Sequence, residues 1–97
     1  MMKVVWTEPA CNQLKSIHQY ISQTSIEYAD RMIDRITHRS EQIAQYPLSG
    51  RIVPEYGHKM VREIIERPYR IIYHILTNQV EVLAVIHGAQ DFESQMS

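Results

Sequence analysis

The stretch YRIIYHILTNQVEVLAVIHGAQDF, which runs from Tyr69 to Phe92, decides how this chain folds. It contains two runs rich in β-branched and aromatic residues, and such runs favour strands. Between them, Thr77, Asn78 and Gln79 predict a hairpin turn, because Asn tolerates the positive φ that tight turns require. We therefore expect two antiparallel strands, the second of which ends in histidine, glycine, alanine, an amide and an acid.

Successive side chains of the last strand should point to opposite faces of the sheet. The two sets expected from strict alternation are Val80, Val82, Ala84 and Ile86 on one face, and Glu81, Leu83, Val85 and His87 on the other. In the strand before it, Ile71, Tyr73 and Ile75 share a face. Both strands are apolar enough to be buried.

The residues that precede the hairpin predict one short strand and two helices. The run KVVW near the start is β-type, and Thr7 follows it with a hydroxyl side chain of the kind that begins helices. A second helix is predicted to begin at a capping box formed by Thr24 and Glu27. It should end near Tyr46, because Pro47 disfavours helical geometry in the residue before it.

These elements predict an α+β fold in the order β-α-α-β-β-β, with a helical hairpin packed on one face of a mostly antiparallel sheet. The 97 residues leave room for one domain, spanning residues 1–97. The single cysteine excludes an internal disulfide, and no apolar run approaches the roughly 18 residues of a membrane span. Because the start lacks the features of a secretory signal, we expect a cytoplasmic protein.

The composition argues against ligands that are held mainly by charge, by a metal or by a glycine-rich loop. Ten Lys and Arg residues stand against eleven Asp and Glu residues, whereas proteins that grip nucleic acid through phosphates usually carry a basic excess. The five histidines lack the short spacing of zinc ligands. Gly50 and Gly57 do not form a phosphate-binding pattern. We expect neither a metal nor a cofactor.

Polar side chains on the predicted sheet are the strongest candidates for catalysis. Arg62, Arg70, His74 and His87 are expected to share a concave surface, with Tyr73 nearby if the strand twists. Cleavage of RNA by its own 2′-hydroxyl needs a general base, a general acid and cations, which Arg and His can supply.

The simpler alternative is that these charged residues pair with opposite charges across neighbouring strands. Arg70 would then pair with Glu63, or Arg62 with Glu81. Such pairs are routine on exposed sheet faces and imply no catalysis.

Five segments of the chain occur in an informative order. They are W-T-x-x-A before the first helix, L-x-x-I-x-x-Y-I, Y-P-L-S-G-R-I-V-P-E, R-E-I-I-x-R-P-Y-R-I-I-Y-H-I and V-L-A-V-I-H-G-A. No single segment is specific, but their order and spacing together resemble the RelE/ParE superfamily of bacterial toxins. The resemblance covers Lys3 to Phe92, almost the entire chain.

The resemblance implies a function as well as a fold. Members of the superfamily are encoded beside an antitoxin, a small protein that wraps the toxin and neutralises it. RelE-like members cleave mRNA in the ribosomal A site, whereas ParE-like members share the fold and poison DNA gyrase. The implied partners are therefore a cognate antitoxin and either DNA gyrase or the ribosome with its mRNA.

Compared position by position, the resemblance favours the ParE-like branch. Arg70 matches the arginine that RelE-like enzymes carry on the third strand. Seven positions earlier, where the nuclease branch tends to have Lys or Arg, this chain has Glu63, and the basic residue expected after the last strand is Gln90. Each lost cation weakens stabilisation of a pentavalent phosphate. We expect a gyrase poison; a ribosome-dependent mRNA endonuclease and a relic that only binds antitoxin are the alternatives.

The candidate site residues follow from these alternatives. If the chain is a nuclease, the candidates for catalysis are Arg62, Arg70, Tyr73 and His87. Strand alternation places Arg62 on the opposite face from Glu63 unless a bulge intervenes. The candidates for contact with a partner are Arg51, Gln90 and Phe92.

Overall fold

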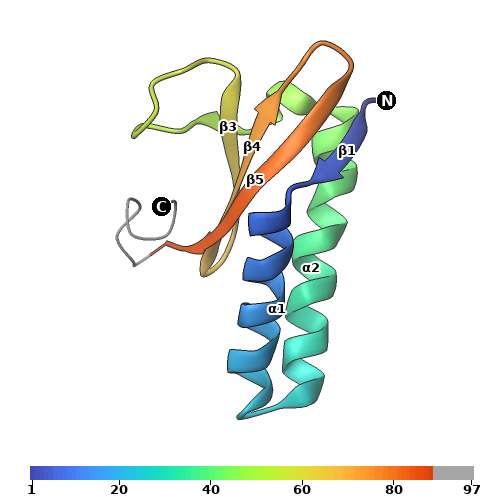
Figure 1. Cartoon of the computed structure of the whole chain (residues 1–97), viewed down its shortest axis with the longest axis vertical. Coiled ribbons are helices and arrows are strands. Elements are labelled where there is room, and N and C mark those ends of the chain that lie inside the picture. Colours follow the sequence, from blue (N-terminus) through green and yellow to red (C-terminus); the bar gives the residue numbers. More distant parts are fainter. Residues whose placement is uncertain (89–97) are drawn as a thin grey trace.

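The computed structural model describes residues 1–88 of the chain (Figure 1). Its elements are β1 (Lys3–Trp6), α1 (Glu8–Ser22), α2 (Ile26–Gln45), the 3₁₀ turn η1 (Pro47–Ser49), β2 (Arg51–Ile52), β3 (Val61–Glu66), β4 (Tyr69–Ile75) and β5 (Gln79–His87). The strands form a sheet in the order β1-β5-β4-β3-β2, in which β1 runs parallel to β5 and the other neighbours are antiparallel. The predicted α+β fold is confirmed, and the structure adds the two-residue strand β2.

The helical hairpin begins as predicted, but its second helix starts later. The Thr7 hydroxyl accepts a hydrogen bond from the backbone of the first turn of α1, as expected. The predicted start of α2 at Thr24 is wrong, because the Thr24 N–H still donates to the carbonyl of Ile21 in the last turn of α1. The chain leaves helical geometry at Ser25, whose hydroxyl accepts from the Tyr28 N–H at 3.1 Å.

Other element boundaries lie close to their predicted places. α2 ends at Gln45, immediately before Tyr46, as the following proline predicted. β4 ends at Ile75 and β5 begins at Gln79, so the hairpin turn comprises residues 76–78 and lies one position earlier than expected.

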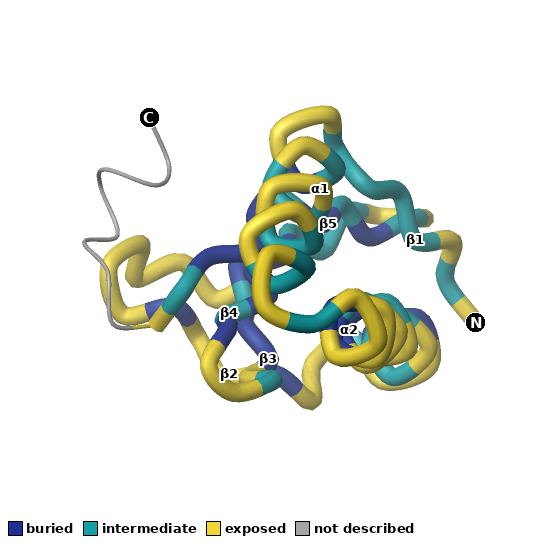
Figure 2. Tube along the Cα trace, turned by 90° about the horizontal axis from the view of Figure 1, so that it is seen from below, coloured by how far each residue is buried: buried dark blue, intermediate teal, exposed yellow. Residues whose placement is uncertain are grey.

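Apolar side chains pack on both faces of the sheet. The larger cluster lies between the sheet and the helical hairpin and contains Ala10, Met32, Ile36, Ile43, Ile64, Tyr69, Ile71, Tyr73, Val80, Val82 and Val85. A smaller cluster on the opposite face, which we call the outer face, contains Val53, Val61, Ile72, Ala84 and Ile86. Figure 2 shows that β3 and β4 are largely buried, whereas both helices expose their outward sides.

A β-bulge in β5 changes which residues occupy each face. Ile72 of β4 pairs with Ala84 and Tyr73 pairs with Val82, so Leu83 is an extra residue between two successive pairs. An extra residue shifts the alternation of the strand by one position. Strict alternation beyond Val82 was therefore a wrong prediction: Val85 joins the helix-facing cluster, and the two apolar residues beside it join the outer face.

Polar side chains of the N-terminal helix stabilise this bulge. The side chain of Gln13 accepts a hydrogen bond from the Val85 N–H at 2.8 Å. The Thr7 hydroxyl donates to the carbonyl of Val82 at 2.8 Å. β1 pairs with β5 only as far as Val82, so beyond that point the side chains of Thr7 and Gln13 supply partners to the backbone of β5.

Candidate functional site

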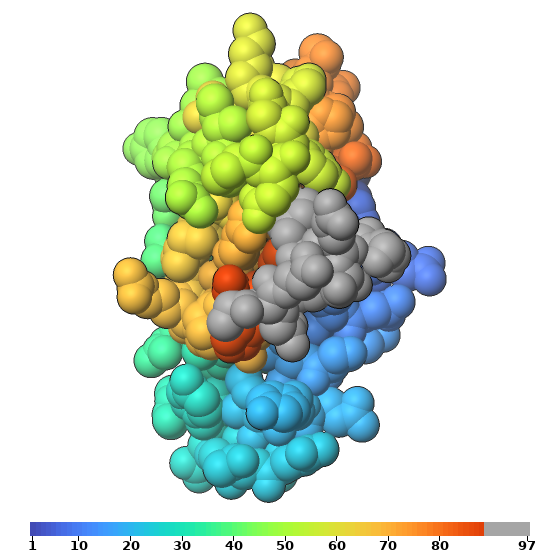
Figure 3. All heavy atoms as spheres, turned by 90° about the vertical axis from the view of Figure 1, so that its left-hand side faces the viewer, coloured from blue at the N-terminus to red at the C-terminus, as the bar shows by residue number. Residues whose placement is uncertain are grey.

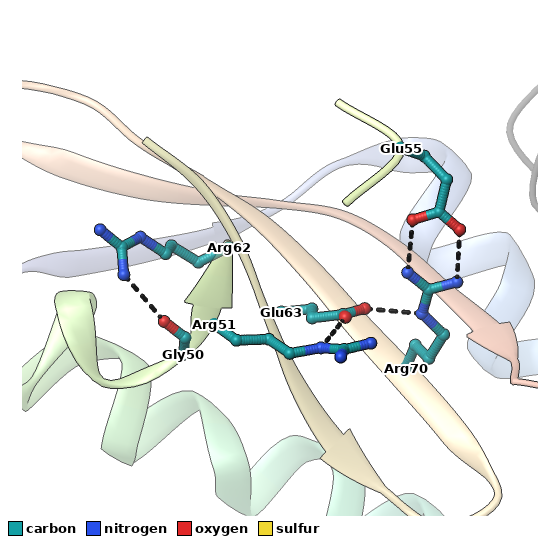
Figure 4. A network of polar contacts seen from close by, with 6 residues as sticks. All are labelled: Gly50, Arg51, Glu55, Arg62, Glu63 and Arg70. Atoms are coloured by element: carbon teal, nitrogen blue, oxygen red, sulfur yellow. Dashed lines mark hydrogen bonds and ion pairs between the residues drawn. The ribbon is translucent and has the colours of Figure 1, made fainter. Parts of the chain in front are cut away.

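Four charged side chains meet on the outer face of the sheet, and we call them the charged cluster (Figure 4). They are Arg51 of β2, Glu63 of β3, Arg70 of β4 and Glu55 of the loop between β2 and β3. The strand register places Arg51 directly opposite Glu63. The loop then folds back so that Glu55 faces Arg70. In Figure 3 this loop, drawn in yellow-green, forms the upper part of the molecular surface.

Arg70 is held from two sides. Its Nε donates to Oε1 of Glu63 at 2.6 Å, while Nη1 and Nη2 donate to the two carboxylate oxygens of Glu55 at 3.0 and 2.9 Å. The other oxygen of Glu63 accepts from Nε of Arg51. The predicted Arg70–Glu63 pair is confirmed, and it is one contact in a larger network of two guanidinium groups and two carboxylates.

Burial differs sharply between the two carboxylates. The side chain of Glu63 is fully buried, and that of Arg70 is 11% exposed, whereas that of Glu55 is 38% exposed. A buried carboxylate without partners would cost several kcal/mol, on the order of 3–5 when a pair is broken, so Glu63 depends on its two arginines. An exposed ion pair contributes only about 0–1 kcal/mol, which makes Glu55 the weaker of the two ligands of Arg70.

The cluster fixes the charge states of its members. The hydrogen bonds from Arg70 lower the pKa of Glu55 below its ordinary value of 4.5. The hydrogen bonds to Glu55 and Glu63, in that order, raise the pKa of Arg70 against the opposing effect of burial. The contact between Arg70 and Glu55 thus favours the charged form of both groups. The cluster has no surplus cation with which to stabilise a developing phosphate charge.

Arg62 and Tyr73 lie on the other side of the sheet and support the turn after α2. They face each other across β3 and β4, and Tyr73 belongs to the helix-facing cluster. The Tyr73 hydroxyl donates to the carbonyl of Pro47 at 2.6 Å and accepts from the Gly50 N–H at 3.1 Å. Arg62 donates to the Gly50 carbonyl at 3.1 Å. The predicted separation of Arg62 from Glu63 is confirmed.

Tyr73 is fully buried, and that burial raises the pKa of its hydroxyl. Gly50 completes the close packing, because a Cβ at that position would lie 2.4 Å from the Tyr73 oxygen and 2.6 Å from a backbone carbonyl oxygen. The side chains of Tyr73 and Arg62 therefore position the segment between α2 and β2.

His87 also lies on the helix-facing side, because the bulge moved it there. It pairs with Tyr69 across the strands, and the two rings meet edge to face with centroids 5.6 Å apart. Of the side chains expected to share one concave surface, only His74 lies on the same face as Arg70. That prediction was wrong for Arg62, Tyr73 and His87.

The predicted pair between Arg62 and Glu81 is also wrong. β4 separates their two strands, and Glu81 lies opposite His74. His74 in turn contacts the ring of His58 at a centroid distance of 6.2 Å. Of the candidates for partner contact, Arg51 belongs to the charged cluster, while Gln90 and Phe92 lie outside the described residues.

No local pattern predicted that Glu55 would bind Arg70. Glu55 lies in a loop, and its place depends on the path that the chain takes after β2. The role of Gln13 at the bulge was missed for a similar reason, since an exposed-looking amide in a helix has many possible partners.

Residues 1–88 contain neither a metal-binding cluster nor a membrane-spanning helix. No three His, Cys, Asp or Glu side chains in this part of the chain gather closely enough to hold a metal ion. None of the helices described is both long and apolar enough to cross a membrane.

A helical hairpin packed on a five-stranded mixed sheet is a fold found in a solved toxin–antitoxin system. The structure of the chromosomal ParDE system from P. aeruginosa matches with a TM-score of 0.74 and 22% sequence identity, covering 90% of this chain and 96% of that chain. At this identity the likeness shows the fold alone.

The family follows from the sequence comparisons. The family model of the ParE toxin of type II toxin-antitoxin systems, parDE, matches residues 4–92, so the chain belongs to this toxin family. Toxin RelE2 of Caulobacter vibrioides is 32% identical over 90 residues, which cover 93% of this chain and 99% of that protein. The putative toxin Y4kP of Sinorhizobium fredii is 34% identical over 92 residues, 93% and 92% of the two chains. The resemblance to the RelE/ParE superfamily is confirmed.

Proposed function

We propose that this toxin inhibits growth by binding DNA gyrase in the cytoplasm and that a cognate antitoxin neutralises it. The antitoxin partner is supported by the family, whose description is that of the toxin of a type II toxin-antitoxin system. The choice of gyrase is supported by the chemistry of the outer face.

The observation that carries the proposal is the engagement of Arg70 by two carboxylates. A nuclease must offer positive charge to the phosphate as it becomes pentavalent, and loss of one such donor typically costs about 3–4 kcal/mol of transition-state stabilisation. Here the guanidinium already binds Glu55 and Glu63. His87, the candidate acid or base, lies on the opposite face of the sheet. Binding to gyrase requires neither group to act on a phosphate.

Purified toxin should be tested in parallel supercoiling and translation reactions. We expect inhibition of gyrase supercoiling at toxin concentrations that leave translation untouched. Addition of the purified antitoxin should restore supercoiling. Codon-dependent mRNA cuts that require ribosomes, together with unaffected supercoiling, would contradict the proposal.

The second candidate is a ribosome-dependent mRNA endonuclease, and the similarity to Toxin RelE2 favours it. RelE-like nucleases place cationic side chains on the same sheet, so Arg70 would have to exchange its carboxylates for a phosphate. A protein that responds in neither reaction yet binds antitoxin would support the third reading, an inactive relic.

A further inference from the structure

We propose that Arg70 is a receptor for a carboxylate of a partner protein and that Glu55 holds the place of that carboxylate until the partner binds. This inference concerns the outer face and does not depend on whether gyrase is the target. It follows from the geometry of the charged cluster, from the freedom of Glu55 to move, and from the side chains that surround the pair.

The guanidinium of Arg70 has an inner and an outer edge with different ligands. Nε faces the buried carboxylate of Glu63, which cannot leave without losing both of its arginines. Nη1 and Nη2 form a two-pronged contact with Glu55, at 3.0 and 2.9 Å. This parallel arrangement is how arginine recognises a carboxylate of a ligand. The outer edge is thus a formed carboxylate site.

Rotation of the Glu55 side chain would open its two contacts with Arg70 to another carboxylate. The loop around it is fixed independently, because Val53 is fully buried and its carbonyl accepts hydrogen bonds from the N–H groups of Tyr56 and Gly57. Glu55 itself is 38% exposed. A partner carboxylate could therefore replace Glu55 while the backbone of the loop stays in place.

Charge and surface chemistry select a protein segment over nucleic acid. With Glu55 turned away, the three remaining members of the charged cluster, Arg51, Arg70 and Glu63, sum to a charge of +1, which a carboxylate complements. Ile65, which lies directly opposite Arg70 on β3, is 40% exposed, and Tyr56 beside Glu55 is 45% exposed. An acidic residue flanked by apolar residues matches this surface, whereas a phosphodiester strand brings several charges and few apolar groups.

The test measures peptide binding to the full chain through the NMR signal of the Arg70 Nε–H, assigned by its loss in Arg70→Lys. The probes are acetyl-Leu-Glu-Leu-amide, the matching Gln peptide and a 5′-phosphorylated thymidine dinucleotide. We expect the Glu peptide to bind Glu55→Gln about fivefold more tightly than wild type, the ratio that corresponds to removing a competing surface ion pair. Glu55→Ala should behave in the same way, and circular dichroism checks that both variants are folded.

The matched control is Asp34→Asn, which removes one exposed negative charge from α2, away from the cluster. It should bind the Glu peptide as wild type does. The proposal is overturned if both Glu55 variants bind within twofold of wild type, or if Asp34→Asn gains as much as they do. It is also overturned if the Gln peptide binds equally well, or if the dinucleotide binds more tightly than the Glu peptide.

Discussion

At the scale of single residues, burial decides how much each acid of the charged cluster contributes to the free energy of unfolding. Glu63 is fully buried between two arginines, while Glu55 is partly exposed. Both acids accept hydrogen bonds from Arg70. The stability that each contributes therefore compares a buried with an exposed ion pair in one network.

Glu63→Gln should lower the free energy of unfolding by about 3 kcal/mol, because it leaves the arginines without their buried charge partner. Glu55→Gln should lower it by about 1 kcal/mol or less. Urea unfolding of both variants at neutral pH measures the difference. Equal losses would show that the buried pair has no special role in stability.

The pH dependence of stability should differ between wild type and Glu55→Gln. Since Arg70 lowers the pKa of Glu55 below 4.5, the pair stabilises the folded state above about that pH and loses its effect as the pH falls through the folded-state value. The gap in unfolding free energy between wild type and variant should therefore close in acid. A gap that persists there would mean that the charge of Glu55 is not its source.

His87→Gln tests whether the histidine acts in toxicity. Because the ring packs on Tyr69 on the helix-facing side, we expect the variant to inhibit growth as wild type does when both are expressed at equal levels. Antitoxin binding serves as the control for folding. Loss of toxicity with intact antitoxin binding would return His87 to the list of catalytic candidates.

At the scale of the elements, local signals in the sequence explain most boundaries. The Thr7 cap, the end of α2 before Pro47 and the hairpin of β4 and β5 each depend on residues within a few positions of one another. The start of α2 was misplaced because two adjacent hydroxyl residues compete for the cap. Which of the two, Thr24 or Ser25, caps α2 depends on where α1 ends.

The faces of β5 were predictable only up to the bulge. Alternation gives the correct face for Val80 and Val82, but the backbone on either side of the extra residue Leu83 is bonded to Thr7 and Gln13, far away in the sequence. The face of His87 was mispredicted for the same reason, since its place was counted along an unbroken strand. Long-range hydrogen bonds to a helix leave no local pattern.

Gln13→Leu should weaken the bulge. The substitution leaves the Val85 N–H without its acceptor, and an unsatisfied buried donor costs about 1–3 kcal/mol. Gln13→Glu keeps an acceptor oxygen and should cost less. Urea unfolding compares the two, and hydrogen exchange at Val85 locates the effect. Unchanged stability in Gln13→Leu would show that the helix does not hold the bulge.

At the scale of the whole molecule, the chain combines near-neutral charge with a small core. Its formal net charge is −1, and the arginines of the outer face are balanced by acids. Such a molecule has little long-range attraction for nucleic acid, which agrees with the proposal that its target is a protein surface. A domain of this size also buries a modest share of its surface, and a bound partner stabilises it by mass action.

We propose that this toxin acts on gyrase, because both arginines of the charged cluster are paired with carboxylates in the described part of the chain. The most direct test is to incubate purified toxin with gyrase, plasmid DNA and ATP and to measure plasmid cut by trapped gyrase. We predict that cut plasmid accumulates with toxin dose and that purified antitoxin prevents it. Plasmid that stays uncut at every dose, with a toxin preparation that still arrests growing cells, would contradict the account.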